Sequence, residues 1–190
     1  MNRTASSPVA ARLADLVAVL DTLGAVPADE AAPRAGEALV PVIADIEWLP
    51  DVYRRVPPGH EEAVYLLQAP ADRSWCVLAV VWKGEAATPV HDHVVWGASG
   101  QLIGRLVEVR YQRIAGDEQR VRSHSAVLHQ PGDVSTVVPP FDVHRVSNPD
   151  AETAVAIQVF GRDLSVVTRH AFDLERGITV VRETVYDGRV

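Results

Sequence analysis

Residues 88–97 read TPVHDHVVWG and place two histidines, His91 and His93, one residue apart. Along a β-strand alternate side chains point to the same face, so both imidazoles would project into the same interior. Two nitrogen ligands at this spacing make one side of a metal site. An isolated pair of this kind is also typical of partly buried or surface histidines, so the interpretation depends on a second segment.

That second segment is PGDVSTVVPPFDVHRVSN, residues 131–148. It combines a turn at 131–133, a short apolar strand, a bend at Pro139-Pro140 and then His144, which opens another apolar stretch. A β-barrel would bring this hairpin opposite the first one. Together the two segments predict a divalent metal site built from His91, His93 and His144.

From about Ala63 onward the chain consists of short β-branched and aromatic runs separated by Gly, Pro, Asn and Asp. The runs are AVYLLQA (63–69), WCVLAVVWK (75–83), LIGRLVEVRYQR (102–113), VRSHSAVLHQ (121–130), DVSTVV (133–138), AVAIQVFG (154–161) and ITVVRETVY (178–186). Many strands with no helices between them indicate an antiparallel sandwich or closed barrel. We predict a mainly β fold, a jelly-roll barrel of about eight strands over residues 51–190.

Helical patterns are confined to the first 50 residues, which we expect to form a cap on the barrel within one domain of 190 residues. Ser7-Pro8 has the form of an N-cap followed by proline at the first helical position, and apolar residues then recur at helical spacing until Gly24. A second stripe predicts another helix that ends before Leu49-Pro50 and is limited or kinked by prolines. Its apolar residues are Leu39, Val42, Ile43 and Ile46.

Composition excludes several classes of protein. The hydrophobic share of 47% and the charged share of 23% are ordinary for a globular chain and do not indicate disorder or a membrane span. The net charge of −7 argues against a nucleic-acid partner, which would favour a basic face. A single cysteine, Cys76, agrees with a reducing compartment, and the N-terminus has no secretory pattern. We expect a cytoplasmic protein, a monomer or a homodimer, that does not bind membranes.

The two histidine segments resemble the paired motifs of the cupin superfamily, in which the first supplies H-x-H and the second supplies G, P, H and N in order. Here these are Gly132, Pro139, His144 and Asn148, while Phe141 stands where a glycine is usual. Most cupins add a glutamate soon after the H-x-H. The sequence WGAS occupies that region, residues 96–99, so no carboxylate ligand is available there.

Further ordered matches resemble the thiol dioxygenases, the cupin family of cysteine dioxygenase and 3-mercaptopropionate dioxygenase. They are WLPDVY (48–53), YLL (65–67), TPVHDHVVWG (88–97), PGDV (131–134), VHRVSN (143–148) and VFGRDLSVVTRHAFD (159–173). The resemblance implies Fe(II), the Fe(2+) ion, on His91, His93 and His144, and addition of both atoms of O2 to a thiol to give a sulfinic acid. It also implies that Arg169 holds a substrate carboxylate, for which a guanidinium is well shaped; a solvated surface arginine is the alternative.

The chain departs from this family at its Ser-His-Tyr relay, where Ala156, Gln158 and Phe160 stand. Gln158 can form hydrogen bonds but cannot shuttle a proton near neutral pH, and Phe160 lacks a phenol. We expect Gln158 to orient a ligand, and Ala156, Phe160 and Trp96 to line the substrate site. Trp96, Phe141 and Phe160 together would make an apolar pocket for a larger thiol, although they are equally compatible with barrel core.

Three functional hypotheses follow. The first is an iron- and O2-dependent oxidoreductase, a thiol dioxygenase-like enzyme acting on a small carboxylate-bearing or bulkier thiol. The second is a metal-binding cupin that has lost thiol oxidation and acts on a non-thiol ligand or as a binding or sensing module. The third, a barrel without a metal, would leave buried imidazoles without partners, each costing about 1–3 kcal/mol. The other histidines, His60, His124, His129 and His170, are assigned no function.

Overall fold

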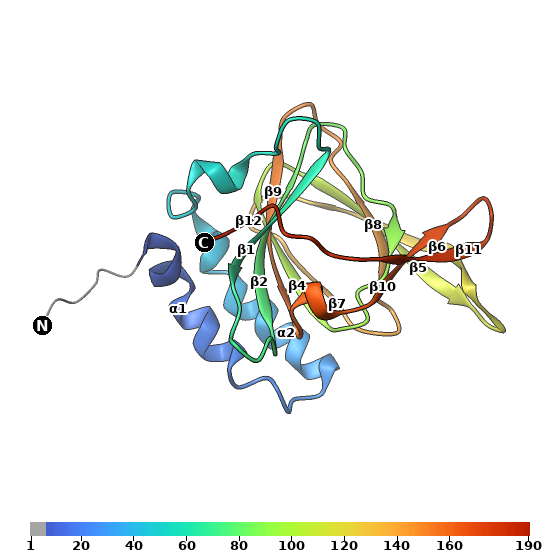
Figure 1. Cartoon of the computed structure of the whole chain (residues 1–190), viewed down its shortest axis with the longest axis horizontal. Helices are drawn as coiled ribbons and strands as arrows, with labels where there is room; N and C mark the ends of the chain where they lie inside the picture. Colours follow the sequence, from blue (N-terminus) through green and yellow to red (C-terminus); the bar gives the residue numbers. More distant parts are fainter. Residues whose placement is uncertain (1–6) are drawn as a thin grey trace, which may run out of the picture.

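Two six-stranded sheets form the body of the protein in the computed structural model, which describes residues 7–190 (Figure 1). The first sheet has the strand order β12 (Gly188–Arg189), β1 (Glu62–Gln68), β2 (Cys76–Trp82), β9 (Ala154–Phe160), β4 (Gly97–Ile103) and β7 (Val134–Val137). The second has the order β11 (Ile178–Arg182), β10 (Arg169–Asp173), β3 (Val90–His91), β8 (Val143–Ser147), β5 (Leu106–Ile114) and β6 (Asp117–His129).

The strand pairings are antiparallel, apart from the short parallel pairing of β12 with β1. Sheet neighbours such as β2 and β9, or β3 and β8, lie far apart in the sequence. This topology confirms the predicted fold class, a mainly β jelly-roll barrel with a helical N-terminal region. Among the described residues no helix is long and apolar enough to cross a membrane.

The first sheet separates two hydrophobic cores, because successive side chains of a strand point to opposite faces. On β9, Val155, Ile157 and Val159 pack into the core beneath the helices. Ala154, Ala156 and Phe160 pack into the core inside the barrel. The predicted inward face of AVAIQVFG is therefore the face that points into the barrel.

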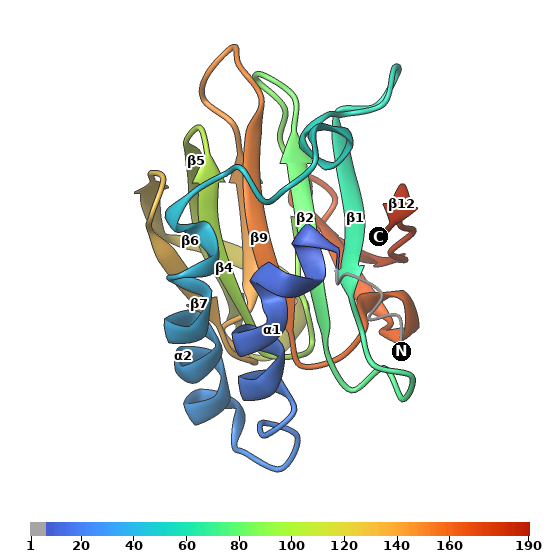
Figure 2. The ribbon, with the colours of Figure 1, turned by 90° about the vertical axis from the view of Figure 1, so that its left-hand side faces the viewer.

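Two helices cover the outer face of the first sheet (Figure 2). Helix α1 (Pro8–Leu20) begins as predicted, because the Ser7 hydroxyl accepts a hydrogen bond from the Ala10 amide at 3.1 Å. It buries the apolar stripe Val9, Leu13, Leu16 and Leu20. Helix α2 (Ala28–Leu39) lies beside it and contacts β4 and β7. Residues 1–6 of the predicted cap lie outside the described residues.

The second predicted helix is wrong in position. The stripe from Leu39 to Ile46 begins where α2 ends, and it continues only as a short 3₁₀ helix, Val42–Ala44, followed by another at Asp51–Arg54. The face of α2 that contacts the sheet consists mainly of small residues, Ala31, Ala32, Ala35 and Gly36. These residues give no large apolar stripe, so the sequence pattern does not predict this helix.

Three strand expectations also need correction. The run LIGRLVEVRYQR is divided between β4 and β5 by Gly104, which has a φ of +68°. Strand β4 begins earlier, at Gly97, where a Cβ would come within 2.6 Å of the Phe160 ring. Strand β10 was not among the predicted runs, and β11 ends at Arg182 instead of Tyr186.

The close contact between α2 and the sheet predicts that Ala35→Leu destabilises the fold. Ala35 is fully buried, so the added atoms overpack the interface and should lower the free energy of unfolding by about 1–3 kcal/mol. Arg34→Leu, on the exposed side of the same helix, should change it by less than about 0.5 kcal/mol. Urea unfolding of the two variants tests this, and equal effects would contradict the packing.

Candidate metal centre

Three histidines meet inside the barrel, as the sequence predicts. His91 on β3 pairs directly with His144 on β8, and His93 follows β3 by two residues. One ring nitrogen from each residue lies within 4.8 Å of the others, and all three side chains are buried. The Nε2 atoms of His93 and His144 are 2.8 Å apart. The group could hold one metal ion.

Hydrogen bonds orient two of these rings. Nδ1 of His91 donates to the Pro89 carbonyl at 2.9 Å, and Nδ1 of His144 donates to the Glu108 carboxylate at 2.8 Å. A carbonyl oxygen and a carboxylate can only accept hydrogen bonds. In His91 and His144 the proton therefore lies on Nδ1, and Nε2 carries the lone pair. The buried Nδ1 of His93 has no hydrogen-bond partner within residues 7–190.

The surroundings favour the uncharged form of His91 and His93. Burial, followed by the charge of His144, lowers the pKa of both His91 and His93 well below the ordinary value. Arg169 and Arg182 lower them further. Imidazole nitrogens that converge in this way are the donor set that divalent transition metals prefer, so the residues present fit such an ion.

Glu108 is a second feature of the centre, and the sequence interpretation missed it. Its carboxylate is buried on β5 and accepts hydrogen bonds from His144, His129 and Arg110. Burial on its own would raise the Glu108 pKa, but the hydrogen bonds from His129 and His144 outweigh it and hold the pKa well below its usual range. One sequence feature could have indicated it: Glu108 lies two positions after the apolar Leu106, so both side chains face the same, buried side of the strand.

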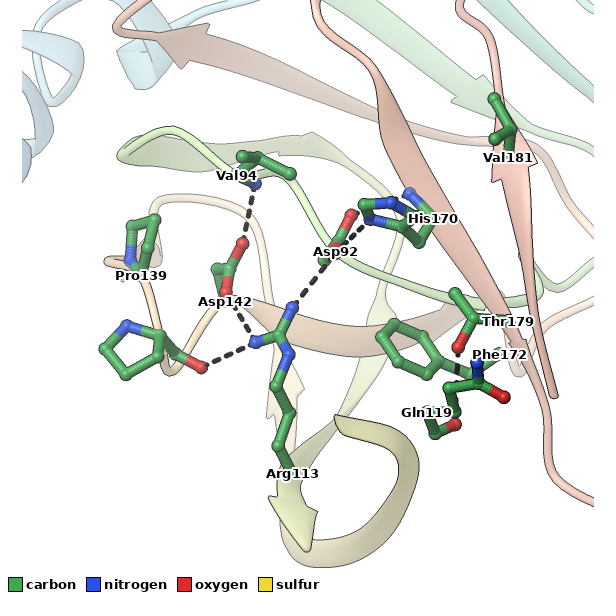
Figure 3. A pocket seen from close by; sticks show the side chains of 11 residues that line it. Asp92, Val94, Arg113, Gln119, Pro139, Asp142, His170, Phe172, Thr179 and Val181 are labelled. Carbon is green, nitrogen blue, oxygen red and sulfur yellow. Dashed lines mark hydrogen bonds and ion pairs between the residues drawn. The ribbon is translucent and has the colours of Figure 1, made fainter. Parts of the chain in front are cut away.

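Asp142 and Arg113 hold the backbone at Val94 (Figure 3). The Asp142 carboxylate accepts hydrogen bonds from the amides of His93, at 3.0 Å, and Val94, at 2.7 Å. Arg113 bridges Asp142 to Asp92, at 3.3 and 2.9 Å. Val94 has a φ of +64°, which is unusual for a β-branched residue, so this network fixes a turn that the chain would not favour by itself.

Asp92, Val94, Arg113 and Asp142 line a cavity of about 550 Å³ that does not include His91, His93 or His144. Asp92, which lies between His91 and His93 in the sequence, points into it. His170 also lines this cavity. Its Nδ1 binds the Asp92 carboxylate at 2.9 Å, a contact that joins β10 to the segment between His91 and His93.

Gln158, Phe160 and Arg169 lie beside the histidines. Gln158 lines all three small cavities around the cluster, with volumes of about 20, 20 and 40 Å³. The Phe160 ring stacks on His93, with centroids 4.6 Å apart and planes inclined by 18°. Arg169 lines the largest of the three cavities, together with His93.

Arg169 is only 4% exposed, so it is not the surface residue of the alternative interpretation. Its guanidinium donates to the Thr184 hydroxyl, while Nε is buried and has no partner in the described part of the chain. Burial, followed by the charge of Arg182, lowers the pKa of Arg169 to about 10. The structure therefore contains a buried cation beside the histidines with hydrogen-bonding capacity to spare.

The expected apolar pocket of Trp96, Phe141 and Phe160 does not form, which corrects the sequence interpretation. Trp96 packs against the core beneath the helices and lines a different cavity, near the end of α1. Phe141 is 67% exposed in the turn after the two prolines. Ala156 is buried on the inward face of β9 but does not line the three small cavities. Of the expected apolar residues, Phe160 alone contacts the histidines.

Several solved structures are similar to parts of the chain. No family model matches the chain. An oxalate oxidase bound to glycolate is similar at 14% identity and a TM-score of 0.46, over 56% of this chain and 54% of that one. The chain thus covers about half the length of that enzyme.

Two further structures are similar. A double-stranded β-helix protein from Klebsiella pneumoniae matches at 15% identity and a TM-score of 0.47, over 64% of this chain and 87% of that one. The Cupin_2 domain of a transcriptional regulator from Enterobacter cloacae matches at 12% identity and a TM-score of 0.39, over 53% and 96%.

The lowered histidine pKa values predict that the metal-free protein loses stability in acid. Unfolded imidazoles take up protons near pH 6.5, whereas folded His91 and His93 stay neutral to lower pH, so acid favours the unfolded chain. As the pH falls below about 6.5, each of these two histidines should lower the free energy of unfolding by up to about 1.4 kcal/mol per pH unit.

His93→Gln removes one of these groups and should reduce that slope by up to about 1.4 kcal/mol per pH unit. Urea unfolding in the presence of a chelator, between about pH 7.5 and about pH 5.5, measures both slopes. Equal slopes for the parent protein and the variant would contradict the assignment of a neutral buried imidazole at position 93.

Proposed function

We propose that the protein is an Fe(II)- and O2-dependent oxidoreductase that converts a small, carboxylate-bearing thiol to a sulfinic acid. One observation carries this proposal: three imidazoles converge, and one of them, His93, lines the same small cavity as Arg169, a cation whose hydrogen bonds are not all used. A ligand that satisfies both must carry one anionic group for each.

His91, His93 and His144 would hold the ion. Three neutral ligands leave a divalent ion its full charge and leave other coordination positions open. Bound ferrous iron would supply the one-electron chemistry that reaction with O2 requires.

Arg169 would bind the carboxylate of the substrate. It is buried and fixed by Thr184, so its orientation is set before the ligand enters, and a carboxylate would complete its hydrogen bonds. The neighbouring Arg182 is already paired with Glu62 at 2.7 Å. Arg169 is therefore the cation of this pair that has capacity for an incoming anion.

The space favours a small substrate over a bulky one. The cavities next to the histidines have volumes of only about 20 to 40 Å³, and Phe160 occupies the position over His93. Gln158 lines each cavity and can donate or accept one hydrogen bond to orient the ligand. These contacts favour a thiol with a short chain between sulfur and carboxylate.

The absence of a Ser-His-Tyr relay is compatible with this reaction. A thiolate plus O2 gives a sulfinate: two S–O bonds form, the O–O bond breaks, and the four electrons that O2 accepts come from sulfur. When the thiol enters as its thiolate, no proton is gained or lost overall. Ala156, Gln158 and Phe160 would therefore need only to shape the cavity and orient the ligand, and their side chains can do this.

The direct test is O2 uptake by protein loaded anaerobically with Fe(II). We expect uptake with 3-mercaptopropionate, a product that gains two oxygen atoms by mass spectrometry, and loss of both in His144→Ala. Stoichiometric iron without uptake for any thiol of the panel, including cysteine and cysteamine, would refute thiol oxidation.

The role of Arg169 predicts a change that depends on the substrate. Arg169→Gln removes a charged hydrogen bond and should raise KM for 3-mercaptopropionate about 10- to 100-fold. The same change should alter KM for cysteamine, which has no carboxylate, by less than about 3-fold. Steady-state O2 consumption measures both values, and an equal effect on the two thiols would exclude a carboxylate contact.

A second candidate is a cupin that retains the metal and has lost thiol oxidation. It is favoured by the lack of any titratable side chain at Ala156, Gln158 and Phe160. Combining Ala156→Ser, Gln158→His and Phe160→Tyr decides between the two. Oxidation that appears only in the triple variant would support the second candidate, and oxidation already present in the parent would exclude it.

A further inference from the structure

We propose that Glu108 is a positioning residue for the metal centre, acting through His144 from a network that His129 and Arg110 complete. This inference rests on the proposed metal site. It gives functions to Glu108 and His129, neither of which belongs to the two histidine motifs.

Glu108 contacts His144 at Nδ1, the ring nitrogen that does not face His93. On the neighbouring strands β5 and β8, Arg110 is opposite His144 and Glu108 is opposite Val146. Oε1 of Glu108 accepts from Nδ1 of His144 at 2.8 Å, while Nε2 of that ring is directed at His93. The carboxylate therefore fixes both the tautomer and the rotation of His144.

The second carboxylate oxygen is held as well. Oε2 accepts from Nε2 of His129 at 3.0 Å and from Arg110 at 3.1 Å. The side chain of Glu108 is 3% exposed and that of His129 is 15% exposed, so the carboxylate is shielded from water, while Arg110 reaches it from a side chain that is 33% exposed. Glu108 could not turn toward the metal position without losing these bonds, which identifies it as a partner of a ligand rather than as a ligand.

The three ligand rings are supported unequally. His91 has a neutral carbonyl behind it, and His93 has no partner at Nδ1 in the described residues. Only His144 has an ionised carboxylate, which makes the ring a stronger electron donor and lowers the reorganisation needed to bind an ion. The residues that follow the H-x-H motif include no glutamate. Glu108 instead supplies a negative charge that is separated from the metal position by the His144 ring.

The experiment measures metal affinity instead of turnover. Co²⁺ binding is followed by competition with a chromophoric chelator, together with the visible spectrum of the Co²⁺ protein. Glu108→Gln should weaken Co²⁺ binding about 10- to 100-fold and shift the Co²⁺ bands. Asp133→Asn is the matched control, because Asp133 lines the same cavity but its carboxylate binds the Gln130 amide and no histidine.

The control should bind Co²⁺ within about 3-fold of the parent protein. Glu108→Gln that also binds within about 3-fold, with unchanged bands, would overturn the proposal. A parent protein that binds no Co²⁺ would instead refute the metal site itself, so the two failures are distinguishable.

If Glu108→Gln does not fold, His129→Gln provides the test. His129 touches Glu108 and is partly exposed, so the change loosens the carboxylate without altering a ligand. We expect Co²⁺ affinity to fall about 3- to 10-fold with shifted bands. An unchanged affinity and spectrum in a folded His129→Gln protein would overturn the proposal.

Discussion

The pairing of His91 on β3 with His144 on β8 is the contact on which the centre depends. It brings two imidazoles into the barrel from segments far apart in the sequence, and the next inward position adds His93. Burying three imidazoles costs free energy unless they stay neutral and find partners. The lowered pKa values of His91 and His93 keep these two rings neutral. A shared ion, together with Pro89 and Glu108, would give most of the ring nitrogens a partner.

The other side chains of the site hold these three rings in place. Asp142 and Arg113 hold the turn that directs His93 inward. Glu108 holds His144, while Phe160 covers His93. What remains open is a small space between the histidines and a buried arginine. A short ligand with two anionic groups complements that space better than a neutral or bulky one.

The sequence predicts the parts of this protein that depend on local periodicity. The spacing of His91 and His93, the capping of α1 by Ser7 and the alternation along β9 are all visible in a linear pattern, and the structure bears them out. Helix α2 was missed because it contacts the sheet through alanines and a glycine, which carry no apolar stripe. The surroundings of Glu108 and Trp96 depend on contacts between distant segments: Glu108 meets His144 and His129 across strands, and Trp96 packs against the core beneath the helices.

The central claim is that the three histidines bind one ion through Nε2, with the carboxylate of Glu108 outside the coordination sphere. A crystal structure of the protein grown with Co²⁺, with anomalous scattering to locate the ion, tests it most directly. We predict a single ion at about 2.1 Å from Nε2 of His91, His93 and His144, with Glu108 still bound to Nδ1 of His144. An ion ligated by Glu108, or no anomalous peak at the three histidines, would contradict the account.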